Sequence, residues 1–572
     1  MFKQHPVFYF LLAILLSCNP AKKNSSYSFD PYKYNGVKKV VAENGVVVSA
    51  HPLASKVGLH ILKMGGNAMD ATIATQLALA VVYPNAGNIG GGGFTVARLS
   101  NGKLLAIDYR ETAPGKATRD MYVDPDGTAR TDKSIDGHLA VAVPGTIAGI
   151  MASYAYAKLP FEKLVQPAID LAEKGFVIGR REASALNKLQ DKLKLLNTVM
   201  PVFVKAGGWE EGDTLVQKDL ANTLKRIQAN KAAGFYEGET ARLLVEEMNR
   251  GGGIISLEDL KNYKAIFREP HQFEYKGYSI VGMPMPSSGG LLVNQMMKMI
   301  EKRDIASMGF HSLKSVQLMT EVERLAYADR SEYMGDNDFY KVPVKTLISE
   351  KYLEARMREY DPQRAGNSRD IKPGDLTPHE SEETTHFSVI DKEGNAVSVT
   401  TTLNNSYGSK TVVGGAGFFL NDIMDDFSIK PGVPNLFGAV GGEANAIAPG
   451  KRMLSSMTPT IVLKDNKTYL IVGTPGGTTI PTSVFQTLIN ILEFGLTTED
   501  AVNQPKFHHQ WLPDSLVLEK NFPATLQESL KTMGYRLQQR EAIGRTEVIR
   551  VLPNGKFEGV ADSRGDDAAE GY

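Results

Sequence analysis

A threonine pair, Thr384 and Thr385, stands where a polar loop gives way to a predicted strand. The loop, residues 373–382, contains two prolines and is typical of an exposed segment that can be cut. The residue pattern predicts strands at 387–390 and 396–403, joined by a turn, with threonines along the second strand. A hydroxyl at the start of this hairpin is therefore a candidate nucleophile.

The hydroxyl of a threonine is a weak nucleophile unless a base lies beside it. One such base is the threonine's own α-amine, which has a pKa of about 8 when it is free. Thr384 has this amine only if the bond between Glu383 and Thr384 is cut. The chemistry thus depends on a cleavage that the sequence alone does not establish.

Other chemistries find little support. His508 and His509 are adjacent, so their side chains lie on different faces of a strand, and no HExxH pattern suggests a metal site. No GxSxG motif marks a serine hydrolase. The glycines within residues 87–94 match neither GxGxxG nor the Walker pattern, which disfavours a bound nucleotide. We therefore expect no metal and no cofactor.

Two further positions suit acyl transfer. Arg110 follows a predicted strand at 104–108, where its guanidinium group is suited to hold a substrate carboxylate; the alternative is a surface ion pair with Glu111. Another predicted strand, 469–473, runs into Gly476 and Gly477, whose successive N–H groups suit an oxyanion hole.

The first 18 residues are typical of an export signal, because Lys3 precedes an apolar run, 7–16, that is too short to span a bilayer comfortably. Cys18, the only cysteine, resembles the lipidated cysteine of bacterial lipoproteins; the alternative is a secreted signal with an incidental cysteine. We expect export to the bacterial periplasm or cell envelope, membrane anchoring through Cys18, and a tether at residues 19–35.

Composition and element order bound the fold. The chain has 64 lysines and arginines in total and the same total of aspartates and glutamates. No surplus of basic residues therefore indicates nucleic acid as a partner. Strands are predicted before residue 110 and again after 385, and residues 144–367 are predicted to be mostly helical. This order indicates stacked sheets with helical layers outside them.

Several separated motifs have the character of one known family. They are residues 65–71 (GGNAMDA), 384–389 (TTHFSV), 402–404 (TLN), 425–428 (DDFS), 454–457 (LSSM) and 507–511 (FHHQW). Together they resemble the γ-glutamyltranspeptidases, which are N-terminal-nucleophile hydrolases, over nearly the whole mature chain. The resemblance implies an α+β fold, a four-layer αββα sandwich.

The resemblance also implies a life cycle and a reaction. The precursor cuts itself before Thr384 into a large chain, 36–383, and a small chain, 384–572, which stay together as a heterodimer. The Thr384 hydroxyl then attacks the γ-amide of glutathione or a related γ-glutamyl compound and forms a γ-glutamyl ester. Water or an acceptor amine takes the acyl group.

Roles follow by position in the family's motifs. Thr402 tunes the nucleophile, and the N–H groups of Gly476 and Gly477 stabilise the oxyanion. The residues implied to bind the donor's α-carboxylate are Arg110, Ser455 and Ser456, and those implied to bind its α-ammonium group are Asn404 and Asp426.

Two positions depart from the family's pattern. Ile423 stands where a Gln or Glu usually helps to bind the α-ammonium group, and losing that acceptor costs about 1.5–3 kcal/mol if it is not replaced. Residues 431–438 resemble the family's lid loop, with Phe437 in place of a common tyrosine. Two alternative functions remain: a β-lactam side-chain acylase of the same fold, and a non-catalytic surface lipoprotein.

Overall fold

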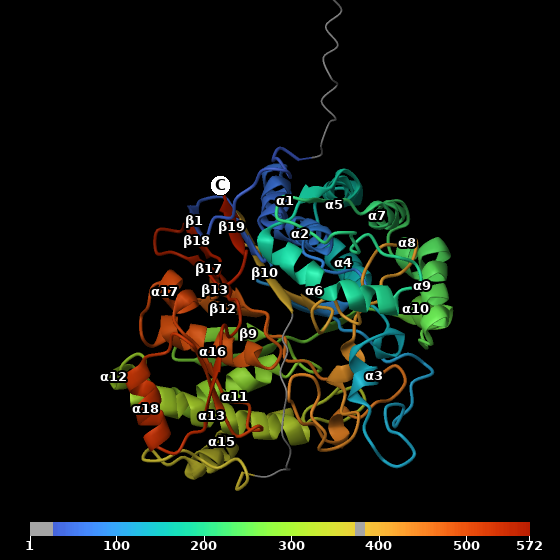
Figure 1. The fold of residues 1–572 in the computed structure, drawn as a ribbon. Coiled ribbons are helices and arrows are strands. Elements are labelled where there is room, and N and C mark those ends of the chain that lie inside the picture. The colour runs from blue at the N-terminus through green and yellow to red at the C-terminus, as the bar shows by residue number, and fades with distance from the viewer. Residues whose placement is uncertain (1–26, 372–383) are drawn as a thin grey trace, which may run out of the picture.

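The computed structural model describes residues 27–371 and 384–572 (Figure 1). The predicted signal, Cys18, and the loop before Thr384 lie outside the described residues. Residues 27–35 of the predicted tether are described and pack against the domain: Tyr27 is buried in the core, and the Tyr34 hydroxyl donates to the carbonyl of Val177 at 2.7 Å. Within the described ranges, no helix is both long enough and apolar enough to cross a membrane.

The first large sheet contains the predicted hairpin and is antiparallel throughout. In spatial order its strands are β19 (Ala568–Gly571), β2 (Gly45–Ser49), β10 (Thr385–Asp391), β11 (Ala396–Thr402), β3 (Gly92–Arg98), β4 (Leu104–Tyr109) and β7 (Ile266–Arg268).

The second large sheet is also antiparallel and is built mostly from the C-terminal part of the chain. Its order is β1 (Lys39–Ala42), β18 (Phe557–Val560), β17 (Glu547–Val551), β13 (Lys467–Gly473), β12 (Thr460–Lys464), β9 (Tyr278–Gly282) and β8 (His271–Tyr275).

The two sheets pack face to face around an apolar layer that includes Val46, Val48, Phe94, Ile471 and Ile549. Successive side chains of a strand point to opposite faces, so Val47 of β2 points instead into the helical core on the outer side. Because both faces of β2 are covered, all five of its residues are buried. This explains why strands such as β2 read as unbroken apolar runs.

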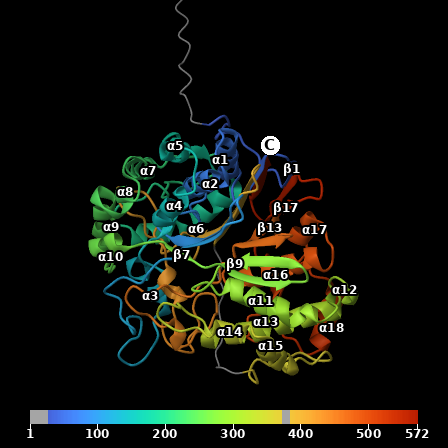
Figure 2. The same ribbon diagram turned by 180° about the vertical axis from the view of Figure 1, so that it is seen from behind.

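Helices cover the outer face of each sheet (Figures 1 and 2). Those on the first sheet include α1 (Pro52–Lys63), α2 (Ala68–Val82) and α4 (Thr146–Tyr154), and α5 (Phe161–Lys174) packs on α2. Those on the second include α11 (Gly289–Glu301) and α16 (Thr479–Leu492), and α13 (Leu313–Tyr333) packs on α11. The prediction of an α+β protein with stacked sheets and outer helices is confirmed.

The remaining elements complete the domain. The helices are α3 (Thr131–Ile135), α6 (Arg180–Leu196), α7 (Lys218–Asn230), α8 (Ala233–Tyr236), α9 (Gly238–Gly251), α10 (Leu257–Asn262), α12 (Ile305–Met308), α14 (Val344–Leu347), α15 (Glu350–Arg356), α17 (Thr498–Asn503) and α18 (Ala524–Thr532). The strands are β5 (Phe176–Val177), β6 (Thr214–Leu215), β14 (Phe507–His508), β15 (Leu516–Glu519) and β16 (Leu537–Arg540), and the 3₁₀ turns are η1 (His138–Ala140), η2 (Met357–Glu359), η3 (Ile423–Asp426) and η4 (Glu443–Asn445).

Residues 144–367 are mostly helical, as predicted, but the stretch also contains the two-residue strands β5 and β6 and the longer strands β7, β8 and β9. The last two form a hairpin whose turn contains Lys276 and Gly277, both with positive φ. These strands are short and lie at or near sheet edges, so their sequence shows little of the apolar alternation that marks a half-buried strand.

Candidate active site

Thr384 lies directly before β10, and its side chain is buried. β10 pairs with β11 so that Thr385 faces Thr401, which sets Thr384 beside Thr402 at the end of β11. The two hydroxyl oxygens are 3.5 Å apart, the outer limit of a hydrogen bond. The predicted nucleophile and its predicted partner are therefore brought together by hairpin register alone.

Thr402 is held in place by the turn that follows it. Asn404 has φ of 86°, a left-handed conformation that asparagine tolerates better than most residues. This turn directs the N–H of Asn404 back to the Thr402 hydroxyl oxygen, at 2.8 Å. The side-chain amide of Asn88 donates to the Thr402 carbonyl at 3.0 Å, so both oxygens of Thr402 are fixed.

Gly476 and Gly477 form the turn between β13 and α16, with φ of 134° and 52°. Such conformations favour glycine. Within the part of the chain that the structure describes, neither of their N–H groups donates a hydrogen bond. They also lie just ahead of α16, whose N-terminal dipole favours negative charge. The pair thus has the free donors that an oxyanion hole requires.

His386 of β10 holds the end of β13 close to the nucleophile. A methyl group on Gly473 would lie 2.2 Å from the His386 ring, so the ring lies directly against this backbone. The ring nitrogens contact the hydroxyls of Thr400 (2.9 Å) and Ser388 (3.1 Å), and burial lowers the pKa of His386 to about 3. A neutral, immobile imidazole therefore links the β10 strand to the strand that leads into the glycine pair.

Arg110 directly follows β4 and is fully buried, which overturns the alternative of a surface ion pair. Its guanidinium group forms an ion pair with Asp426 of η3 and lies 3.7 Å from a carboxylate oxygen of Glu111. Burial raises the pKa of Asp426, and the charge of Arg110 opposes that rise. A cation and an anion are thus paired beside each other in the region where a zwitterion is predicted to bind.

Ser455 and Ser456 are also buried. They lie next to the ion pair of Arg110 and Asp426, since Arg110 approaches the carbonyl oxygens of the two preceding residues, Met453 and Leu454, at 3.4 Å. Ser456 accepts a hydrogen bond from Arg330 of α13, at 3.1 Å. Sequence reasoning missed Arg330. The only available signal was a cation within a helix whose residues are buried almost throughout, and this does not identify a partner.

Phe437 lies over the glycine pair. A methyl group on Gly477 would lie 2.6 Å from Cδ1 of the Phe437 ring. The loop is fastened by the side chain of Asn435, which donates to Asp426 at 3.4 Å, and by Gln510, which donates to the Phe437 carbonyl at 3.0 Å. Ile423, by contrast, is fully buried in an apolar cluster with residues such as Tyr122.

Glu111, which the sequence analysis considered only as a surface partner of Arg110, also lies in this region. Its carboxyl group is fully buried, and neither oxygen accepts a hydrogen bond from the described residues. Burial raises the pKa of Glu111 to about 7. A methyl group on Gly92, the register partner of Thr402, would lie 2.5 Å from one of its oxygens. Glu111 therefore lies one strand away from the threonine pair.

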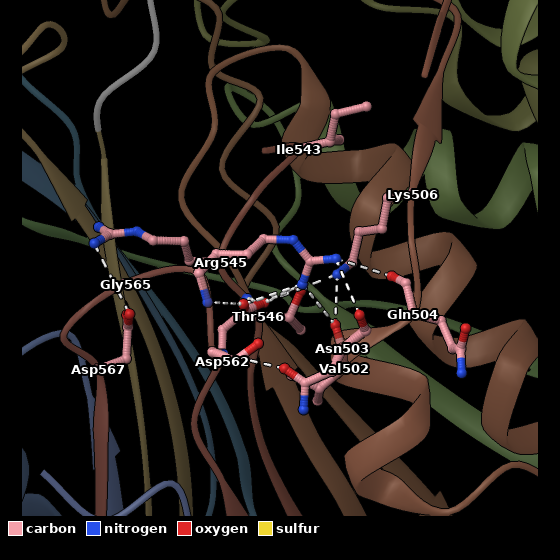
Figure 3. Close-up of polar contacts among 12 residues, drawn as sticks. Val502, Asn503, Gln504, Lys506, Ile543, Arg545, Thr546, Asp562, Gly565 and Asp567 are labelled. Atoms are coloured by element: carbon pink, nitrogen blue, oxygen red, sulfur yellow. Dashed lines mark hydrogen bonds and ion pairs between the residues drawn. The ribbon is translucent and has the colours of Figure 1, made fainter. Parts of the chain in front are cut away.

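A buried ionic cluster that includes Lys506 and Asp562 lies beside Arg545 and Thr546 (Figure 3). The N–H of Arg545 donates to the Thr474 hydroxyl, two residues before Gly476, at 2.8 Å. The neighbouring loop is centred on Arg564, which donates to both oxygens of Glu519 at 2.7 Å and to Asp562 at 3.0 and 3.1 Å. Within the described residues, no group of three or more metal-ligating side chains is placed to hold an ion.

Comparison with known proteins identifies the family of this chain. The family model of γ-glutamyltranspeptidase matches residues 54–572. The chain belongs to the γ-glutamyltranspeptidase family. It is 47% identical over 544 residues to the glutathione hydrolase proenzyme of Escherichia coli K12, an alignment that covers 93% of each chain.

Two solved structures are similar to this chain. Cephalosporin acylase from Bacillus halodurans matches with a TM-score of 0.82 and 26% identity, covering 95% of this chain and 99% of that one. The γ-glutamyltranspeptidase of Helicobacter pylori matches with a TM-score of 0.56 and 42% identity, covering 60% of this chain and 97% of that one.

Proposed function

We propose that this γ-glutamyltranspeptidase is a glutathione hydrolase proenzyme that becomes active when the bond before Thr384 is cut. The observation that carries the proposal is the placement of the buried Thr384 hydroxyl 3.5 Å from that of Thr402. The glycine pair follows β13 of the facing sheet, which contacts β10 through His386, and its N–H groups donate to no acceptor among the described residues. Cleavage divides the chain into 36–383 and 384–572, which remain packed together because both contribute strands to each sheet.

The new α-amine of Thr384 then serves as the base. With a free pKa of about 8, it accepts the hydroxyl proton as Oγ1 attacks the γ-carbonyl carbon of the donor. The N–H groups of Gly476 and Gly477 stabilise the oxyanion of the tetrahedral intermediate. The C–N bond breaks, the amine leaves with the proton, and a γ-glutamyl ester remains on Thr384. Water or an acceptor amine repeats the sequence and releases the acyl group.

Donor binding uses the ion pair that fills the site. The α-carboxylate of the γ-glutamyl group binds Arg110, Ser455 and Ser456, and the α-ammonium group binds Asp426 and Asn404. Arg110 and Asp426 contact each other in the structure, so a bound zwitterion exchanges one internal ion pair for two intermolecular ones. Neither Arg110 nor Asp426 is therefore left buried without an oppositely charged partner, whether or not the donor is bound.

The same proposal includes the finer architecture and the location of the enzyme. Two facing sheets with helices outside them support a four-layer αββα sandwich of the N-terminal-nucleophile type. Residues 1–18 are proposed as the export signal, Cys18 as the site of lipidation, and the bacterial periplasm or cell envelope as the destination. Phe437 is proposed as the lid residue over the glycine pair.

A β-lactam side-chain acylase is the second candidate, because the cephalosporin acylase structure is so similar. The buried pairing of Arg110 with Asp426 favours the first candidate, since an amino-acid zwitterion presents the two opposite charges that would replace it. Ile423 lies in an apolar cluster, so its side chain does not supply a further charged contact to either kind of donor.

One experiment tests the proposed function. Purified protein is run on a denaturing gel and incubated with glutathione, and released glutamate is measured. We expect two chains of unequal size and glutamate release, and for Thr384→Ala we expect a single chain without release. A single wild-type chain would refute the cleavage. In a parallel incubation with a cephalosporin, release of its side chain, together with no release of glutamate from glutathione, would favour the acylase.

A further inference from the structure

Arg330 is a buried cation that the proposed reaction does not use. It lies on α13, and it forms no ion pair with any carboxylate among the residues that the structure describes. Its side chain instead donates to two hydroxyl groups, from Nε to Ser288 and from a terminal nitrogen to Ser456, each at 3.1 Å. A buried cation held only by neutral groups is costly, which indicates that an anion completes its environment.

The surrounding charges have the same implication. Arg110 and Arg330 influence each other electrostatically, and both also sense Asp426, which already forms an ion pair with Arg110. Two arginines therefore share one fully committed carboxylate. Glu111, another nearby acid, has a pKa raised to about 7 by burial, and its carboxylate lies 3.7 Å from Arg110. Among the described residues, Arg330 therefore has no carboxylate of its own.

Hydrogen bonds determine how Arg330 affects the serine pair, Ser455 and Ser456. The Ser456 oxygen accepts from Arg330, so its single proton points away from that guanidinium group. The Ser455 oxygen similarly accepts from the N–H of Met457, at 3.1 Å. Ser288 accepts from Arg330 and donates to the Ser455 carbonyl at 2.7 Å, which fastens the backbone of the serine pair to the same arginine. Both serine protons are therefore available to one external acceptor.

We propose that Arg330 is a positioning and specificity residue, which orients the Ser456 hydroxyl toward the α-carboxylate of the donor and makes the enzyme select donors that carry this group. The inference rests on the proposed function, because it assigns the α-carboxylate to the serine pair. Arg330 does not touch the donor itself. It acts through Ser456 and through its charge.

The test compares two donors, L-γ-glutamyl 4-nitroanilide and the 4-aminobutanoyl analogue that lacks the α-carboxylate. For Arg330→Met we expect KM for the γ-glutamyl donor to rise about tenfold or more, with kcat changed less than threefold. The kcat/KM of the analogue should stay within twofold of the wild-type value. Equal losses on both donors, or a loss confined to kcat, would overturn the inference.

A double-mutant cycle covers the case in which Arg330→Met does not fold. Arg330→Lys keeps the charge but loses the planar guanidinium group that reaches both Ser288 and Ser456, and we expect KM to rise at least threefold. In a Ser456→Ala background the same change should have less than a 1.5-fold effect, because its target is gone. Fully additive effects would overturn the inference.

The matched control is Arg324→Lys, a buried arginine on the same helix that contacts Ser368 and Asp514 instead of the serine pair. It should leave the ratio of the two kcat/KM values unchanged, and a shifted ratio would count against a specific role for Arg330. If the wild-type protein transfers no γ-glutamyl group, the proposed function fails. If it does so but Arg330 variants are unselective, only this inference fails.

Discussion

The backbone of Gly477 lies directly beneath the ring of Phe437, so closely that a single added methyl group would come within 2.6 Å of ring atom Cδ1. The proposed oxyanion hole and the proposed lid are thus one packing unit. In the proposed reaction the N–H of Gly477 points at the developing oxyanion, so any residue that displaces this backbone changes the geometry of the hole, even though every N–H group is still present.

Gly477→Ala should therefore lower kcat by about 100-fold, the size of effect seen when one oxyanion donor is lost. The φ of 52° adds strain for a residue with Cβ. Steady-state kinetics on a γ-glutamyl anilide measure the effect. Adding Phe437→Ala should restore part of the activity by making room. Gly450→Ala is the control, since its φ is also positive and no atom lies within 4 Å of the added methyl group.

Thr402→Val tests the partner of the nucleophile. The substitution keeps the shape of the side chain but removes the oxygen that lies near Thr384 and accepts from the Asn404 N–H. An unsatisfied buried N–H costs about 1–3 kcal/mol, so we expect lower stability and a kcat reduced by roughly 10- to 100-fold. Thr402→Ser should retain most of both. Unchanged kcat in the valine variant, measured on fully cleaved protein, would contradict this role.

Glu111 should make stability depend on pH. Its pKa is raised from an ordinary value of 4.5 to about 7 in the folded protein, so between these values the folded state binds more protons than the unfolded state. Stability from this group is complete below pH 4.5 and is lost as the pH rises through 7. The loss amounts to at most about 3.4 kcal/mol, from 1.36 kcal/mol per pKa unit over about 2.5 units.

Urea unfolding at pH 5 and pH 7.5 measures this effect. Glu111→Gln cannot ionise, so we expect a smaller fall in the free energy of unfolding between the two pH values than in the wild type. Glu210→Gln, at an exposed position, should follow the wild type. Parallel curves for Glu111→Gln and wild type would show that Glu111 does not titrate in this range.

The sequence predicted those parts of the site that follow from local patterns. Thr384 and Thr402 are brought together by the register of one hairpin, and the glycine pair follows directly from the end of a strand. The contact of Arg330 with Ser456 joins residues 126 positions apart, through a helix packed on the far side of a sheet. No periodicity encodes such a contact. The burial that raises the pKa of Glu111 likewise depends on several elements at once.

Ile423 is a second case in which packing between distant segments could not be predicted from the sequence. Its place in a motif suggested a weakened contact with the α-ammonium group. Its side chain is fully buried among apolar residues, a surrounding that includes Tyr122 and Met453 from distant segments. Position in a motif indicates which residues are near a site, whereas the direction of a side chain is decided by packing.

Arg564→Met should be the most destabilising of these changes. Arg564 forms charge-assisted bonds to Glu519 and Asp562 and donates to the carbonyls of Val502, Asn503 and Gln504 (Figure 3). Removing the cation leaves two buried carboxylates without their main partner, which costs about 3–5 kcal/mol. Asp562 also accepts from the N–H of Thr546, and the adjacent Arg545 donates to Thr474, two residues before Gly476.

Thermal unfolding and kcat measured on the same samples check this prediction. We expect a lower Tm and, at temperatures where the variant is still folded, a reduced kcat, because the glycine turn loses its support. Arg180→Met is the matched control: this arginine is exposed and forms a surface pair with Glu211, so it should change the Tm little. An Arg564→Met protein with the wild-type Tm would show that the cluster contributes no net stability.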